Sequence, residues 1–139
     1  MAEVSQAYTW LYSTLTGDSA LTSAATGGVF QGYARIGTAV PYATFNQQTS
    51  SDVLTMNVKR LFSNGLYQVK AIGPARLYST LTTIADRIDA LIGRSGPVTL
   101  SPGYVLSSFR EQQIQYEELV NGEQWSHVGG LYRIYLQGV

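Results

Sequence analysis

The sequence has 139 residues, about the length of one domain, with nine basic and nine acidic side chains and no cysteine. The lack of cysteine excludes a disulfide framework and zinc–thiolate sites, and the balanced charge lacks the basic excess that drives non-specific nucleic-acid binding. No stretch approaches the roughly 18 apolar residues of a membrane span, and no signal peptide is expected. Only 13% of residues are charged and ten are tyrosines, a composition that favours protein interfaces.

The first third of the chain predicts two helices followed by extended segments. Apolar residues at helical spacing predict a helix over residues 3–16. Asp18 or Ser19 can cap a second short helix, and extended segments are expected at 29–36 and 42–46. A polar stretch without periodicity follows and is expected to form an exposed loop. It consists of Gln47, Gln48, Thr49, Ser50, Ser51 and Asp52.

The strongest local signal in the sequence is a hairpin in the middle of the chain. Residues 53–62 alternate apolar and polar side chains, and Asn64-Gly65, a favoured two-residue turn, leads into a second strand over 66–72. In this register Lys59 lies opposite Lys70, on the face away from the expected core. Both lysines extend into water, or a glutamate lies between them, or the face meets an anionic partner such as a neighbouring subunit or passing DNA.

The second half of the chain predicts one long amphipathic helix and two long strands. Gly73-Pro74 opens the helix, whose apolar stripe runs to Ile92. Strands are expected over 104–118 and 124–137, joined by a turn at Asn121-Gly122. The whole chain is therefore expected to be a single α+β domain. Its largely antiparallel β-sheet would carry the long amphipathic helix and the N-terminal helix on one face.

The single histidine, His127, is the first candidate for chemistry. One histidine with scattered acids does not match a metal site, and no Gly-x-Ser-x-Gly elbow supports a Ser-His-Asp triad. Gly129-Gly130 precedes a β-prone run, not a helix, which indicates a strand bulge or bend instead of a phosphate cradle. We expect His127 to be a strand residue packed beside Trp125, and we expect no catalytic residue, cofactor or metal.

The order of elements resembles a family of virion proteins. The features that carry the resemblance are an N-terminal helix, Pro41-Tyr42 at a strand start, a hairpin, an amphipathic helix ending in Ala90-Leu91-Ile92-Gly93, and the closing stretch NGEQWSHVGGLYRIYLQ. They are similar to the tail terminator (tail-completion) proteins of long-tailed bacteriophages. The resemblance implies an α+β subunit of a six-copy ring that caps the tail tube and joins it to the neck. It implies no cofactor and no catalytic residue.

The resemblance also implies the partners and the location of the protein. The partners would be further copies of the chain, the tail tube protein and a neck or head-completion protein, with DNA passing through the ring and no membrane. The location would be the tail–neck junction of a virion made in the bacterial cytoplasm. Ring closure needs contacts between two different patches. We expect these patches at residues 47–52 and at the final turn, which comprises Val120, Asn121, Gly122 and Glu123.

Three other functions stay open from the sequence. A head-completion or adaptor component of the neck would share the size and the ring habit of a tail terminator. A small-molecule binder would use the concave face of a curved sheet, and it would need an apolar cavity for which the many Ser, Thr and Gln residues offer little lining. A small hydrolase would depend on His127 and would lose its activity when that residue is substituted.

Overall fold

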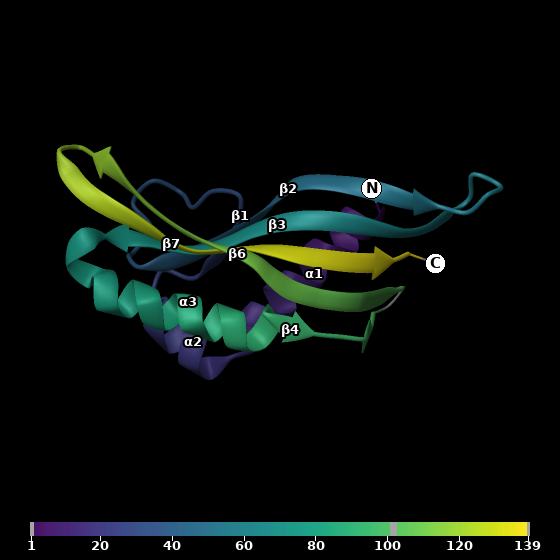
Figure 1. Ribbon diagram of the computed structural model, residues 1–139. Coiled ribbons are helices and arrows are strands. Elements are labelled where there is room, and N and C mark those ends of the chain that lie inside the picture. Colours follow the sequence, from purple (N-terminus) through teal and green to yellow (C-terminus); the bar gives the residue numbers. More distant parts are fainter. Residues whose placement is uncertain (1, 101–102, 139) are drawn as a thin grey trace.

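The computed structural model describes residues 2–100 and 103–138, which form a twisted β-sheet with helices on one of its faces (Figure 1). The predicted α+β class, with a largely antiparallel sheet, is confirmed. The helices are α1 (Ala2–Thr16), α2 (Ser19–Ala24) and α3 (Tyr78–Ile92), and a short 3-10 helix, η1 (Ala75–Leu77), precedes α3. The strands are β1 (Val29–Gln31), β2 (Tyr42–Leu54), β3 (Arg60–Pro74), β4 (Arg94–Ser95), β5 (Val98–Thr99), β6 (Tyr104–Val120) and β7 (Glu123–Gln137).

The sheet is built from two long hairpins joined side by side. Its order within the described residues is β1-β2-β3-β7-β6-β4, and β5 also pairs with β6. The β1–β2 pair is parallel, and the other described pairs are antiparallel. The β2–β3 hairpin and the β6–β7 hairpin extend toward opposite ends of the molecule (Figure 1).

The helices α1 and α2 form near where the sequence predicts them, but Gly73-Pro74, expected to open the long helix, end β3 instead, and α3 begins at Tyr78. The long helices α1 and α3 each bury an apolar stripe. Leu11 and Leu15 of α1 are fully buried, as are Leu81, Ile84 and Ile88 of α3. Each such side chain stabilises the fold by about 1.5–3 kcal/mol relative to exposure. They pack against the inner face of the sheet, which is lined by the buried side chains of Phe45, Tyr67, Val69, Tyr132 and Ile134.

A polar contact fixes α2 against α3. The Asp18 carboxylate accepts a hydrogen bond from the Leu21 backbone N–H at 3.0 Å and thereby caps α2, as the sequence predicts. The same carboxylate accepts two hydrogen bonds from the Arg87 guanidinium of α3, at 2.9 and 2.7 Å. The Arg87 guanidinium holds the pKa of Asp18 below its usual value, so the cap stays ionised to a lower pH than an isolated aspartate would.

The predicted central hairpin is wrong in its turn position. Asn64 and Gly65 lie inside β3, where they pair with Ser51 and Ser50 of β2, and the turn is formed by residues 55–59. The segment 47–52, expected to be an exposed loop, is therefore part of β2. Three apolar side chains expected in the core are exposed at the hairpin tip instead. They are Leu54 (50% exposed), Met56 (102%) and Val58 (75%).

The final hairpin has the predicted turn, but its glycines have a different role from the predicted one. Asn121 and Gly122 have positive φ, as a two-residue hairpin turn requires. The β7 register is continuous through Gly129-Gly130, so of the expected bulge or bend the bulge is absent there. Glycine is needed at position 129 for space, because a Cβ atom there would lie 2.2 Å from the Val69 carbonyl oxygen.

We predict that Gly129→Ala destabilises the protein by about 1–3 kcal/mol, the usual cost of overpacking a well-packed interior. The added methyl group would force β3 and β7 apart at their central pairs. Gly130→Ala is the matched control, because its nearest contacts lie at 3.1 Å and two of the three belong to side chains. Chemical unfolding of both variants measures the difference, and equal stabilities would contradict this account of Gly129.

Candidate interaction surfaces

The two segments expected to contact neighbouring subunits lie at opposite edges of the sheet. Residues 47–52 belong to β2, and Val120–Glu123 form the tip of the β6–β7 hairpin. Side chains 48–52 are exposed, as are Asn121, Gly122 and Glu123. The structure does not bring the two segments together within one subunit. They can meet only if one copy contributes the first segment and a second copy contributes the other.

Both outer strands are unpaired over about half of their length. On β2, the partner β1 covers residues 43–45, and the Gln47 N–H donates to the Tyr8 hydroxyl at 2.9 Å. On β6, the short strands β4 and β5 pair with four residues between Tyr104 and Phe109. In the part of the chain that the structure describes, no strand pairs with the outer side of Gln48–Leu54 or of Glu111–Val120. We call these segments the β2 open edge and the β6 open edge.

The predicted opposition of Lys59 and Lys70 is wrong, because the hairpin turn that set their register does not exist. Lys70 lies in β3 between Thr44 of β2 and Gly129 of β7. Lys59 lies in the turn at the tip of the β2–β3 hairpin, where it is exposed and forms no ion pair with the described residues. The two lysines therefore do not form one anion-binding patch.

A polar cluster occupies the outer face of the sheet, which we define as the face away from the helices. The Tyr116 ring stacks on the His127 ring with centroids 4.4 Å apart, and the Lys70 ammonium lies 5.0 Å from the Tyr116 centroid and contacts its hydroxyl. The Glu118 carboxylate lies 2.6 Å from His127 Nε2. His127 thus packs against Tyr116 of the neighbouring strand β6. From the sequence we expected it to pack beside Trp125.

Burial disfavours the protonated form of His127 in the folded protein. The side chain is 8% exposed, and desolvation lowers its pKa below the ordinary 6.5, an effect that Lys70 reinforces and the Glu118 carboxylate opposes. The second ring nitrogen, Nδ1, is buried and has no hydrogen-bond partner among the described residues. Within residues 2–100 and 103–138, no hydroxyl group is therefore bonded to this imidazole, whereas a Ser-His-Asp arrangement would require one.

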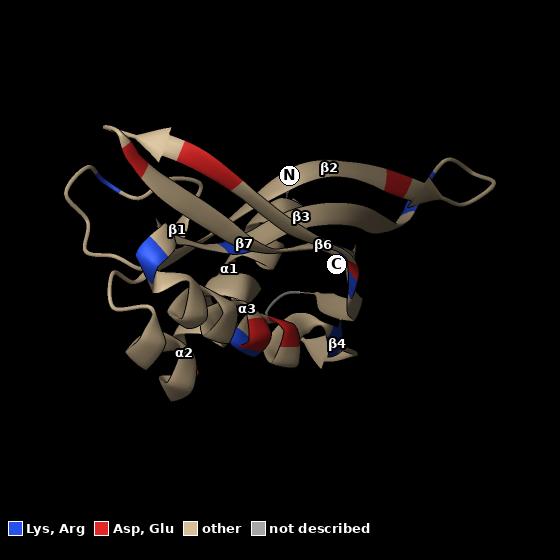
Figure 2. Cartoon of the chain, turned by 60° about the vertical axis from the view of Figure 1, so that its left-hand side comes forward, with Lys and Arg blue, Asp and Glu red and all other residues tan. Residues whose placement is uncertain are grey.

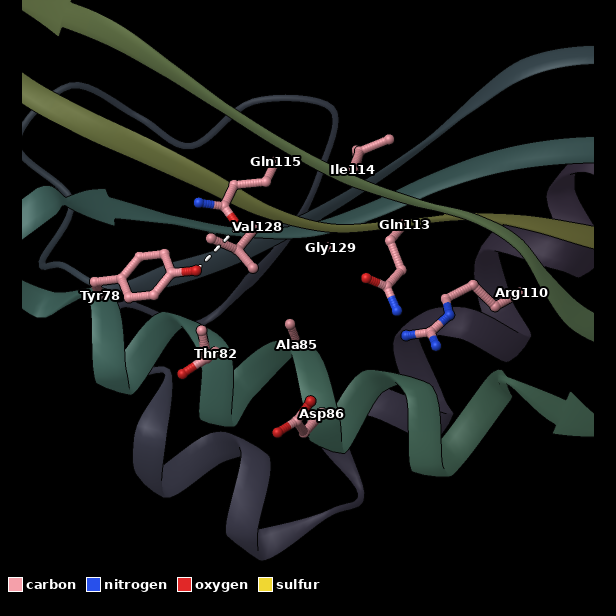
Figure 3. A pocket seen from close by; sticks show the side chains of 10 residues that line it. All are labelled: Tyr78, Thr82, Ala85, Asp86, Arg110, Gln113, Ile114, Gln115, Val128 and Gly129. Carbon is pink, nitrogen blue, oxygen red and sulfur yellow. Dashed lines mark hydrogen bonds between the residues drawn. The ribbon is translucent and has the colours of Figure 1, made fainter.

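An open groove of about 380 Å³ lies between α3 and the β6 open edge (Figure 3). Tyr78 and Asp86 stand on its helix wall, and Gln113 and Gln115 stand on its strand wall. The Tyr78 hydroxyl donates to Gln115 Oε1 at 3.0 Å across the groove. Asp86 is exposed and forms no ion pair within the described part of the chain. The groove is not apparent from the sequence, because its walls come from α3 and β6, which are separate segments of the chain.

Charged side chains divide unevenly between the two hairpins. The distal part of the β6–β7 hairpin carries Glu117, Glu118 and Glu123, whereas the distal part of the β2–β3 hairpin carries Asp52, Lys59 and Arg60 (Figure 2). Among residues 2–100 and 103–138 no group of three or more acidic or histidine side chains could hold a metal ion. No helix in this range is both long and apolar enough to cross a bilayer.

The fold is that of an α+β domain with a helix-covered, largely antiparallel sheet, whose outer strands are partly unpaired within the described residues. No protein-family model and no curated protein sequence matches the chain. Among solved structures, a chain of the virion of a native gene transfer agent particle has the same fold, with a TM-score of 0.72 at 13% identity over 92% of both chains. A second solved chain has a TM-score of 0.49 at 13% identity over 94% of this chain and 91% of its own, a likeness too weak to carry an argument.

We predict that His127 makes the stability of the protein pH-dependent. Its pKa is lower in the folded state than the unfolded value near 6.5, so the unfolded chain binds the proton first. The free energy of unfolding therefore falls as the pH drops below about 6.5. His127→Gln should lack this contribution. Denaturant titrations of both proteins between about pH 7.5 and 5 measure it, and parallel pH profiles would show that His127 does not titrate differently in the two states.

Proposed function

We propose that this protein is a structural virion protein that forms a ring at the end of a phage-type tail tube and joins the tube to the head. The observation that carries the proposal is the likeness of its fold, over 92% of both chains, to a chain of the gene transfer agent virion. The order of elements that resembles tail terminators supports the same function. A six-copy ring, the tail tube and the neck protein as partners, and the tail–neck junction as the location belong to this proposal.

The surface of the subunit supports a role in assembly. Two uncovered sheet edges on opposite sides give each copy two different patches, as a ring of heterologous contacts needs. The groove beside α3 and the outer-face groove of about 430 Å³ are open and carry many polar side chains, which offer little to an apolar small molecule. A third open groove has a more apolar lining that includes Tyr12, Val29 and Phe30. The proposed function therefore requires no catalysis and no cofactor.

A neck adaptor is the second candidate, because a ring subunit of similar size could join the head instead of the tube. Purified protein added to isolated tail tubes and to DNA-filled heads distinguishes the two functions. A tail terminator associates with the tubes and then allows them to join heads. Association with heads alone would support the adaptor, and association with neither would contradict both.

We predict that removing the gene from a producing host gives particles with irregular or extended tails and unattached heads in electron micrographs. The unmodified gene, supplied in trans, should restore joined particles. His127→Gln should restore them equally well, because the proposal gives the imidazole a packing role. Loss of particle formation with His127→Gln, in a variant that folds with normal stability, would instead favour a catalytic role for His127. Normal particles without the gene would overturn the proposed function.

A further inference from the structure

We propose that the copies join by strand addition, with the β2 open edge of one subunit pairing antiparallel with the β6 open edge of the next. The inference deepens the proposed ring function and rests on it. Unpaired strand edges template pairing with another chain, so native proteins usually protect them with proline, lysine or a covering segment. Neither the β2 open edge, QTSSDVL, nor the β6 open edge, EQQIQYEELV, contains proline or lysine.

The acids on these edges have hydrogen-bond or ion-pair partners within the subunit. The Glu111 carboxylate accepts hydrogen bonds from the Arg133 guanidinium at 2.9 Å. Glu117 accepts a hydrogen bond from the Ser126 hydroxyl at 2.5 Å, and Glu118 is bound to His127. Asp52 on the β2 open edge lies 3.8 Å from Arg60. The Arg133 and Arg60 guanidinium groups thus balance the charges of Glu111 and Asp52, whereas Glu117 and Glu118 keep their negative charge.

The chain direction of the two edges suits this pairing. Antiparallel contacts from β2 to β3, from β3 to β7 and from β7 to β6 leave β2 and β6 antiparallel to each other. A second copy placed beside the first with the same faces aligned therefore presents β2 antiparallel to β6. The two open edges lie toward opposite ends of the sheet (Figure 1). Neighbouring copies are consequently staggered along the strands, as closed sheets of tilted strands require.

The backbone groups of the two edges are also in matching phase. The two-residue turn makes Val120 and Glu123 a hydrogen-bonded pair, so the alternation directs the backbone groups of Gln113, Gln115 and Glu117 outward. On β2, the N–H groups of Ala43 and Gln47 point away from β3. The strand pairing shifts by one residue at Gln48, so beyond it the backbone groups of Ser50 and Asp52 are the ones that point away from β3. These are the groups that a ladder between Ser50–Asp52 and Gln115–Glu117 would use.

In this pairing the helix-side faces of the two neighbouring sheets also lie on the same side. The side chains of Gln115 and Glu117 point to the helix side of the sheet, because they contact Tyr78 of α3 and Ser126, a buried residue of β7. Asp52 pairs with the buried residue Ser63 and points to the same side. A strand added here would cover the groove beside α3 (Figure 3).

Charge complementarity identifies a second copy as the occupant. When residues 50–54 lie antiparallel to residues 113–117, the hairpin tip of the incoming subunit extends past Gln113 toward the groove wall that carries Asp86. The tip brings Lys59, and neither Lys59 nor Asp86 has an ion-pair partner among the described residues of one subunit. Arg110 also lines the groove, and its guanidinium lies 3.6 Å from the Asp89 carboxylate. Met56 and Val58, exposed at the same tip, would also be covered in part.

Cysteine crosslinking tests the pairing, because the natural chain has no cysteine. Ser50→Cys and Leu119→Cys place one thiol on each edge. In the proposed ladder Ser50 pairs with Glu117, so the thiols at positions 50 and 119 are diagonal neighbours. The purified double variant, treated with a short bismaleimide, should give a ladder of covalent oligomers on a denaturing gel that ends at the ring copy number. Each single variant should stay monomeric on the gel. Dimers from either single variant, or no ladder from the double variant, would overturn the proposal.

Proline substitution supplies an independent readout. Ser50→Pro removes an outward N–H without breaking the β2–β3 ladder, whereas Ser50→Thr keeps the N–H and suits a strand. Light scattering after size exclusion should show loss of the oligomer with Ser50→Pro and an unchanged oligomer with Ser50→Thr. Melting curves must show that both variants fold. An unchanged oligomer in a folded Ser50→Pro variant would contradict strand addition.

Crosslinking and particle formation can fail separately. A double-variant ladder together with normal particles in the gene deletion would retain the pairing and reject the virion function. Joined particles that depend on the gene, together with single-variant dimers or no ladder, would retain the function and reject the pairing of these two edges.

Discussion

The antiparallel ladder between β3 and β7 is the constraint on which the rest of the structure depends. It joins Ser63–Pro74 to Trp125–Leu136 in twelve consecutive pairs and so makes one sheet from two hairpins. Its inner face provides Tyr67, Val69 and Ile134 to the core that the helices cover. Because the hairpins on its two sides extend in opposite directions, the ladder also leaves β2 and β6 as outer strands with unpaired distal halves.

The sequence predicted the elements that local chemistry determines. The helices α1 and α3 follow from apolar spacing, and the final turn follows from Asn121-Gly122. The central hairpin could not be predicted in this way, because tertiary pairing overrides the turn preference of Asn64-Gly65. Asn64 accepts a hydrogen bond from Arg133 Nη1 at 3.0 Å, and Gly65 leaves room for the Tyr67 ring. Both residues therefore lie within paired strands of the sheet and do not form a turn.

The candidate surfaces were only partly visible in the sequence. Residues 48–52 lack periodicity because their side chains are exposed on both faces of the sheet, so the sequence of this edge strand resembles that of a loop. The cluster of Lys70, Tyr116, His127 and Glu118 depends on the β3–β7–β6 register, which no local pattern encodes. An open edge is defined by a missing strand partner. It therefore becomes recognisable only when the whole sheet is known.

Backbone hydrogen exchange tests the central claim most directly, namely that the protein works by completing its sheet with further copies of itself. The assembled protein and the folded Ser50→Pro variant are compared at equal concentration. The account predicts slower exchange in the assembly for peptides covering 49–54 and 112–119, with the β3–β7 ladder equally protected in both. Equal exchange of these two edges in both states, with new protection on another surface, would contradict it.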